Sequence, residues 1–545
     1  MNSLLAPGRI PFGRIMKRTM LVAALSVLCA AQLAWFAPKT LYAVDFDGMA
    51  YTSIAATLRA GLFKESLDAF RSPLISWLIA VVPGLPVLVA GKLLTLLTFL
   101  GTCILLYVFT LELWHSEVIA ATAVTLLLLA RGLTFFAVAL VTPDYLFALI
   151  VLLYFIAMLR SLRAGTERWW NLGLAHAAAF LAKGIALPWL GVCTITAAFI
   201  SSGGRNVRIK RLSSALVIPI VIAGFWATAL HAKYGVFTTG SQFKMNLLQW
   251  TLRGTTPQPA SRYQLLRDIS PNMSEHMVYD PMPPGAWEWN YHLDLSLVLK
   301  RAVHAEMRNL PLAARELLLL MTPGIPLAFF ALFPFLFRSP EMRAERVLAV
   351  TIVVGSVALV LAYAMLVIDS RYFFPLIPLW FAVGSKMLWP DARLGLQRMR
   401  WLCIGLVLAG TIFSLTYWAS PFRVQTRDWT VICRAASNAL KKHQSKTVVS
   451  LGSGPFPEHG VGWEAGYFAA YYGNARLVAT LDKIPQKLEG LPSDIAQASP
   501  DAVLLWETDQ QKRDLLRRTL DAKYPNDEKI VDPQLGEVGL VLCRR

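Results

Sequence analysis

Ionisable side chains lie at the ends of apolar segments in four places along this chain. These are Asp45 and Asp47 in DFDGMAYTSIAATLRAG, Asp144 in VTPDYLF, Lys183 in FLAKGIALP, and Asp369 with Arg371 in DSRYFFPLIP. Ionisable groups at membrane depth are costly and are functional candidates by default. These four places are therefore the first candidates for chemistry.

The residue types suit the transfer of a sugar from a lipid phosphate. A carboxylate can act as a general base that removes the proton of an attacking hydroxyl group. The departing phosphate develops negative charge, which Lys183 and Arg371 would stabilise. Arg matches phosphate with a planar fork, whereas Lys acts as a point charge.

Each place also has a purely structural interpretation. Asp47 would cap an interfacial helix whose apolar side rests on lipid, with Tyr51, Ile54, Ala55, Leu58 and Leu62 spaced to share one face. Asp144 would cap its own helix, and Lys183 would snorkel towards the interface. Asp369 and Arg371 would pair with each other at a turn.

The composition predicts a polytopic membrane protein. The chain has 545 residues, of which 56% are hydrophobic and only 16% are charged, and its mean hydropathy is +0.50. Soluble domains carry about a quarter charged residues. Many of the basic residues behind the formal charge of +18 lie in short clusters between apolar segments, a pattern that reflects topology and anionic lipid headgroups rather than nucleic acid.

A membrane span needs about 20 apolar residues, and the hydropathy pattern predicts eleven spans. They lie near 19–37, 91–112, 117–138, 144–162, 169–184, 186–201, 212–231, 316–337, 347–367, 372–389 and 401–419. The apolar stretch 73–82 is too short to span and is interpreted as a re-entrant or surface-lying helix. Ser72 and Pro73 would be its N-cap and first helical residue.

Arginine-rich connections predict the orientation of these spans. Loops rich in Lys and Arg face the cytoplasm, and the four such connections are 160–168, 204–211, 338–346 and 391–400. They fit an uncleaved first span with its N-terminus in the cytoplasm. Segment 38–71, loop 232–315 and the tail after residue 420 then lie outside, and all four charged places fall on that outer face.

Loop 232–315 is too long for a bare connection and is expected to fold over the membrane face. Its aromatic and basic residues would stack on sugars or form an interfacial belt, and its histidines have no metal-ligand spacing. The aromatic and basic residues are Trp250, Arg253, Tyr263, Arg267, Trp287, Trp289 and Tyr291, and the histidines are His276, His292 and His304.

The tail has the alternating pattern of a small α/β domain. Short buried strands are predicted at 447–452, 475–480, 501–506 and 538–543, with an amphipathic helix at 509–523. Cys433 and Cys543 would both lie in the oxidising compartment, where a disulfide between them is one interpretation and two free thiols the other. The predicted domains are therefore 1–420 in the membrane, with outer loops 38–71 and 232–315, and 421–545 in the periplasm.

Five motifs in order resemble the C-superfamily (GT-C) of membrane glycosyltransferases, in the bacterial branch related to the dolichyl-phosphate-mannose protein mannosyltransferases and the lipid A aminoarabinose transferase. They are DGMAYTSIAATLRAG, FRSPLISWLIA, TPDYLFALIVLLYF, FLAKGIALPWL and DSRYFFPLIPLWF. The resemblance covers about residues 18–420. It implies a mostly α fold in the bacterial inner membrane, a polyprenyl-phosphate sugar donor, and a glycolipid, glycan or protein acceptor on the periplasmic side.

The resemblance also implies roles for single residues. Asp47 matches the catalytic aspartate of the first outer loop, Asp144 a second acid, Lys183 the lysine of the AKG motif, and Arg371 with Tyr372 an arginine-tyrosine pair. The predicted catalytic residues are Asp47, Asp45 and Asp144. The residues predicted to bind the lipid phosphate or the sugar are Tyr51, Arg71, Lys183, Asp369, Arg371 and Tyr372.

Two positions depart from the family pattern. Gly48 follows Asp47 where relatives often have a second acid, so Asp45 either compensates or that role is absent. Arg71 stands near the place of a lysine that some relatives have before the proline of FRSP. Relatives differ in metal dependence, so a divalent metal stays open as a cofactor, although the sequence shows no separate metal cage.

Two other classes of protein share some of these features. A transporter or flippase of envelope lipids or glycans also buries charges among many spans, although no internal repeat of the kind such folds often show stands out here. A non-catalytic envelope assembly protein would use the α/β tail to hold a partner. Because the charged residues gather at one predicted face, the pattern favours the enzyme.

Overall fold

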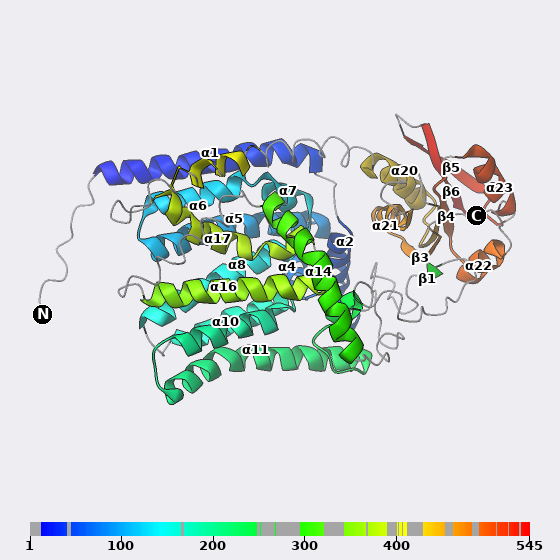
Figure 1. Ribbon diagram of the computed structural model, residues 1–545. Coiled ribbons are helices and arrows are strands. Elements are labelled where there is room, and N and C mark those ends of the chain that lie inside the picture. Colours follow the sequence, from blue (N-terminus) through cyan, green and yellow to red (C-terminus); the bar gives the residue numbers. More distant parts are fainter. Residues whose placement is uncertain are drawn as a thin grey trace, which may run out of the picture.

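The computed structural model describes most of the chain, with gaps. The described residues are 12–40, 45–164, 168–247, 251, 267–268, 295–320, 343–366, 369–389, 400–401, 403–405, 407–410, 412, 429–452, 462–481, 490–507, 509–520, 523–532 and 536–544. A body of helices carries a small sheet-containing domain at one end (Figure 1).

Apolar helices form most of the body. Those long and apolar enough to cross a membrane are α5 (Val87–Trp114), α8 (Asp144–Ala164), α11 (Arg205–Tyr234) and α16 (Arg343–Ala364). Shorter apolar segments lie in α1 (Phe12–Thr40), in α10 (Ala186–Ile200), and in α17 (Leu376–Gly384) with the following 3-10 turn η5 (Ser385–Leu388). Helix α9 (Trp169–Ala182) packs between α8 and α11.

The predicted span 117–138 is broken. Helices α6 (Glu117–Leu129) and α7 (Arg131–Ala139) meet at an angle of 64°. Helices α8 and α11 also run through the arginine-rich segments 160–164 and 205–211, which the sequence placed in connections. The predicted spans 316–337 and 401–419 lie mainly outside the described residues, so the count of eleven stays a prediction.

Tight helix packing holds the middle of the body together. Gly355 of α16 lies so close to α10 that an added Cβ would come within 2.6 Å of the Cys193 Sγ atom. The Trp189 indole of α10 donates a 2.7 Å hydrogen bond to the Gly355 carbonyl. Small residues allow such close helix approach inside membranes, and the buried indole N–H finds a partner across the same contact.

The segment after α1 folds into three short helices on one end of this body. They are α2 (Phe46–Arg59), α3 (Phe63–Ser66) and α4 (Leu74–Ala80). Tyr51, Ile54 and Ala55 are buried as expected, but the α2 face packs on α4 and α5 rather than on lipid. Arg59 ends α2 and donates to four carbonyls in and after α4, including those of Ile79 and Leu85 at 2.7 and 2.6 Å.

The expected capping of α4 is wrong. Pro73 is the N-cap residue and no side chain caps the helix. The Ser72 hydroxyl instead accepts a 3.1 Å hydrogen bond from the Gly184 amide, directly after Lys183. The serine therefore fastens α4 to the end of α9.

Loop 232–315 is described only in part. Helix α12 (Gln242–Asn246), strand β1 (Arg267–Asp268) and helix α14 (Leu295–Leu320) belong to it or follow it. His304 lies exposed on α14. The side chains of the other aromatic, basic and histidine residues predicted to act in this loop lie outside the described residues.

The tail is an α/β domain, as predicted. Its sheet has the order β1-β3-β2-β4-β6-β5, with β2 (Thr447–Leu451) parallel to β3 (Arg476–Leu481) and β4 (Ala502–Leu505). Strands β6 (Gly536–Cys543) and β5 (Asn526–Asp532) continue it in antiparallel fashion. Strand β5 was missed by the sequence reading, and β1 adds two residues of loop 232–315 at the other edge.

Helices cover both faces of this sheet. Val448 packs on the side of α20 (Trp429–Lys442) and α21 (Gly462–Gly473), which faces the helical body (Figure 1). Val449, the next residue of β2, packs on the side of α22 (Leu491–Ala498) and α23 (Gln510–Leu520). This alternation is the period of two that a strand requires. Cys433 and Cys543 are buried free thiols and not a disulfide.

Candidate functional site

Helix α2 begins at the site, and Asp45 is its N-cap residue. Its carboxylate accepts a 3.1 Å hydrogen bond from the Gly48 amide, which satisfies one of the amides left open at a helix start. The expectation that Asp47 caps this helix is therefore wrong. With the cap supplied by Asp45, the Asp47 side chain turns to other partners and remains 36% exposed.

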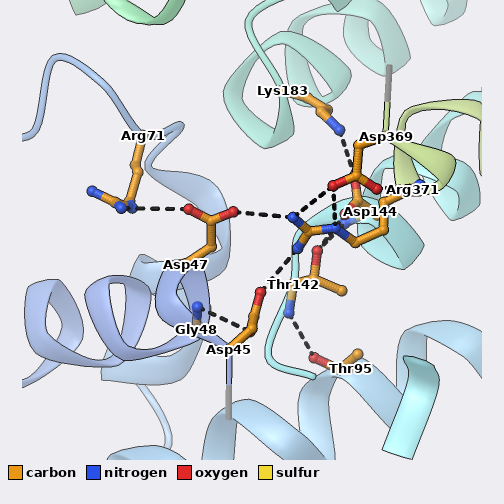
Figure 2. A network of polar contacts seen from close by, with 10 residues as sticks. All are labelled: Asp45, Asp47, Gly48, Arg71, Thr95, Thr142, Asp144, Lys183, Asp369 and Arg371. Carbon is orange, nitrogen blue, oxygen red and sulfur yellow. Dashed lines mark hydrogen bonds and ion pairs between the residues drawn. The ribbon is translucent and has the colours of Figure 1, made fainter. Parts of the chain in front are cut away.

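Arg371 is the centre of the cluster (Figure 2). It lies in the 3-10 turn η4 (Ser370–Phe373), which Asp369 caps by accepting from the Arg371 amide at 3.0 Å. Its guanidinium donates to Asp45 at 2.9 Å, to Asp369 at 3.1 and 3.2 Å, and to Asp47 at 3.4 Å. The expected pairing of Asp369 with Arg371 is present, and the same arginine also joins both carboxylates of α2.

Arg71 approaches Asp47 from the opposite side. Its guanidinium lies 3.4 Å from the Asp47 carboxylate, and its side chain is only 2% exposed. Asp68, which the sequence reading missed, accepts hydrogen bonds from the Phe70 and Arg71 amides at 2.6 and 2.8 Å. An aspartate whose side chain accepts hydrogen bonds from backbone amides two and three residues ahead is typical of a turn. The sequence DAFR, residues 68–71, has this pattern.

A second ion pair lies beside Arg371. The Lys183 ammonium, at the C-cap of α9, is hydrogen-bonded to Asp144, the first residue of α8, and the Thr142 hydroxyl donates to the same carboxylate. The Lys183 Nζ lies 4.8 Å from the centre of the Tyr372 ring. Tyr372 stacks on Tyr363 with ring centres 4.3 Å apart, so an aromatic pair covers the lysine.

The structure therefore brings the predicted charged residues together from four separate segments. Figure 2 shows Asp144 and Lys183 next to Asp369 and Arg371, with Asp45 and Asp47 across the arginine. Tyr51, on the same helix as Asp47, is buried. Five carboxylates face three cations here: Asp45, Asp47, Asp68, Asp144 and Asp369 against Arg71, Lys183 and Arg371.

Burial within this cluster changes the protonation of Asp45. Burial raises the pKa of Asp45 to about 6, against the opposing effect of Arg371 and with a contribution from the negative charge of Asp47. Burial alone would also raise the pKa of Asp369, but Arg371 holds it below its usual value. The two carboxylates bound most closely to one arginine thus differ in protonation behaviour.

One further cation was missed. Lys92 of α5 donates to the carbonyls of Thr40, Val138 and Ala139 at 2.8, 3.3 and 3.2 Å. Its ammonium therefore bridges the C-terminal ends of α1 and α7, and it interacts electrostatically with Asp45. A lysine in an otherwise apolar helix is the signal that would have found it.

Among the described residues, no three His, Cys, Asp or Glu side chains are grouped so that they could hold a metal ion. The cluster is instead crosslinked by its own arginines and lysine.

A helical body of apolar segments with a charged cluster at one end and an α/β domain beside it defines a membrane-protein architecture. The particular fold is that of ArnT. The crystal structure of ArnT from Cupriavidus metallidurans in the apo state superimposes with a TM-score of 0.56 at 14% identity, over 97% of this chain and 98% of that chain. The same protein bound to undecaprenyl phosphate gives 0.54 at 14% identity, over 96% and 97%.

Other comparisons give less. The archaeal oligosaccharyltransferase AglB from Archaeoglobus fulgidus scores 0.44 at 10% identity, over 90% of this chain and 69% of that chain, which is too low to establish a shared fold. No protein-family model matches the chain. No curated protein matches it by sequence.

Proposed function

We propose that this chain is a glycosyltransferase that moves a sugar from a polyprenyl-phosphate donor to an acceptor on the periplasmic side of the bacterial inner membrane. Support comes from the family resemblance of the sequence motifs and from the shared fold with ArnT, which was solved with undecaprenyl phosphate bound. In this proposal the chain crosses the membrane eleven times. The cluster and the α/β domain, residues 421–545, face the periplasm.

The observation that carries the proposal is the bonding of Arg371. One guanidinium holds Asp45, Asp47 and Asp369, and of these three carboxylates Asp47 has the longest contact, 3.4 Å. A phosphate offers Arg a bidentate, charge-assisted partner. A donor phosphate that binds Arg371 would therefore draw it away from Asp47 first and leave that carboxylate, with Arg71 as its remaining partner, to accept a proton.

The proposed reaction is a displacement at the anomeric carbon of the donor sugar. The acceptor hydroxyl attacks the anomeric carbon of the donor sugar and gives its proton to Asp47. The bond between the anomeric carbon and the phosphate oxygen breaks, and polyprenyl phosphate leaves with the electron pair. Arg371 and Lys183 stabilise the charge on the leaving phosphate. Tyr372 lies against Lys183. The buried side chain of Tyr51 anchors α2, the helix that carries Asp47.

The other carboxylates have supporting roles in this proposal. Asp45 fixes the start of α2 and competes for Arg371, while Asp144 holds the Lys183 ammonium in place. Asp68 orients the backbone of Arg71, which in turn lies against Asp47.

Mass spectrometry of envelope glycolipids, glycans and glycoproteins tests the proposal. Cells that lack the protein should lose one sugar modification, which the wild-type chain restores and Asp47→Asn does not. The matched control is Asp514→Asn, an exposed aspartate on α23 far from the cluster. Full restoration by Asp47→Asn would remove the base assignment. Unchanged sugars with an altered lipid distribution would point to a flippase instead.

A further inference from the structure

A groove lies between α8 and α9 at the ends remote from the charged cluster. Its volume is about 490 Å³, and its apolar wall includes Leu153, Ile156 and Leu174. Leu153 is 43% exposed and Leu174 is 48% exposed. Exposed leucines on two apolar helices are the surface that membrane helices present to lipid chains.

The groove ends in polar side chains. Arg160, Arg168 and Asn171 line it together with the apolar wall. Asp144 and Arg160 are separated by sixteen residues of α8, about 24 Å along the helix axis. Since Asp144 belongs to the charged cluster, the arginines lie at the opposite membrane surface, on the side that the positive-inside rule assigns to the cytoplasm.

The two arginines differ in their bonding. Arg160 is held by Glu112, to which its Nε donates at 3.1 Å and its Nη2 makes a second bond. Arg163, on the same turn of α8, is held by Glu345. Arg168 is exposed, and no described residue accepts a hydrogen bond from it or forms an ion pair with it. The groove therefore keeps one positive charge that the described part of the chain leaves uncompensated.

We propose that this groove binds one anionic phospholipid, whose phosphate is bound by Arg168 and Asn171 and whose acyl chain lies along Leu153 and Leu174. Basic pockets between helices on the cytoplasmic side of a membrane protein are suited to anionic headgroups. One guanidinium that the described residues leave uncompensated matches the single charge of a phosphodiester, and the apolar wall requires a ligand that carries a chain. The inference does not depend on the proposed transfer reaction.

Native mass spectrometry of the full-length protein released from lipid nanodiscs tests this. In nanodiscs of mixed phosphatidylglycerol and phosphatidylcholine, the wild-type chain should retain one phosphatidylglycerol in preference. Arg168→Gln should lower that preference about fivefold, the factor that one cation near an anionic membrane surface contributes. Arg168→Lys should keep most of it, and Arg205→Gln, an exposed arginine at the start of α11 on the same side, should change nothing.

Glu112 supplies a second test of the opposite sign. Glu112→Gln releases Arg160 into the groove and should raise phosphatidylglycerol retention. Glu117→Gln removes the same charge at the start of α6, close in sequence but outside the groove lining, and should leave retention unchanged. Equal effects of Arg168→Gln and Arg205→Gln, or equal effects of Glu112→Gln and Glu117→Gln, would overturn the proposal, as would equal retention of both lipids by the wild type.

Discussion

Replacement of Arg371 by glutamine tests the electrostatic account of the cluster. Arg371→Gln leaves Asp45, Asp47 and Asp369 facing one another without their shared cation. Breaking a buried ion pair from one side costs about 3–5 kcal/mol. Asp47 and Asp369 are 36% and 34% exposed, so solvent screens their contribution to the lost unfolding free energy. Asp45 is only 20% exposed and therefore contributes most of the loss.

We therefore expect a loss of about 3 kcal/mol in the free energy of unfolding. For a chain of this size that lowers the unfolding midpoint in detergent, measured by scanning fluorimetry, by about 3 °C. Arg205→Gln is the matched control, because it removes an exposed arginine and should leave the midpoint within about 1 °C.

The stability deficit of Arg371→Gln should depend on pH in a definite direction. Burial raises the pKa of Asp45 to about 6, so the attraction between Asp45 and Arg371 is present above that pH and is lost as the pH falls through it. In the variant the lowering effect of Arg371 is absent, so Asp45 takes up its proton at a still higher pH and its repulsion of Asp47 is lost as the pH falls. The deficit of Arg371→Gln should thus shrink between pH 7.5 and pH 5, and Asp45→Asn in the same chain should recover part of it. A deficit that is equal at both pH values would refute the reasoning.

Three further predictions concern neighbouring contacts. Because the folded chain holds a proton on Asp45 up to about pH 6 while an unfolded aspartate releases it near pH 4, this group lowers stability as the pH rises between the two values, and Asp45→Asn should remove that slope from the midpoint-against-pH curve. The Tyr471 hydroxyl of α21 and the Thr52 hydroxyl of α2 share a 2.8 Å hydrogen bond. Tyr471→Phe should therefore speed hydrogen exchange in α2 by roughly fivefold, about 1 kcal/mol, and unchanged exchange would show that the contact does not stabilise the helix. Lys183→Met leaves the Asp144 carboxylate buried without its cation and should cost about 3–5 kcal/mol in unfolding free energy, most of which a second change, Asp144→Asn, should restore.

The convergence of the charged residues could be predicted from the sequence because the predicted topology puts them on one membrane face. Asp144 opens one apolar segment, Lys183 closes the next, and Arg371 lies between two later ones. The structure places their side chains in one cluster. What the spacing could not supply was the order of contacts, since Arg371 reaches Asp45 across 326 residues of sequence.

The helix caps were predicted wrongly because tertiary contacts outweigh local sequence patterns at these positions. Asp45 and Asp47 are both reasonable caps two residues apart, and the choice depends on where Phe46 begins the helix. Ser72 precedes Pro73 in a favourable capping pattern, yet its hydroxyl accepts from Gly184 of another segment. A side chain with two available partners follows the packing, which no local pattern encodes.

The buried strands of the α/β domain were predicted from the sequence, but its edge strand β5 was not. Strands β2 and β4 are apolar on both faces, as central parallel strands are. Strand β5 reads NDEKIVD and is an edge strand, and charged residues are typical of edges because they discourage pairing with other chains. The same charges hide such a strand from a search for apolar runs.

Transfer by the purified protein is the most direct measurement of the central claim. The wild-type chain, reconstituted with a polyprenyl-phosphate sugar and membrane-derived acceptors, should release one polyprenyl phosphate for each sugar transferred. Asp47→Asn should lower that rate by about 10²–10⁴-fold, the usual contribution of a general base, while Asp514→Asn keeps it. Transfer by Asp47→Asn at the wild-type rate would contradict the account, and so would the absence of any sugar transfer by the wild-type chain.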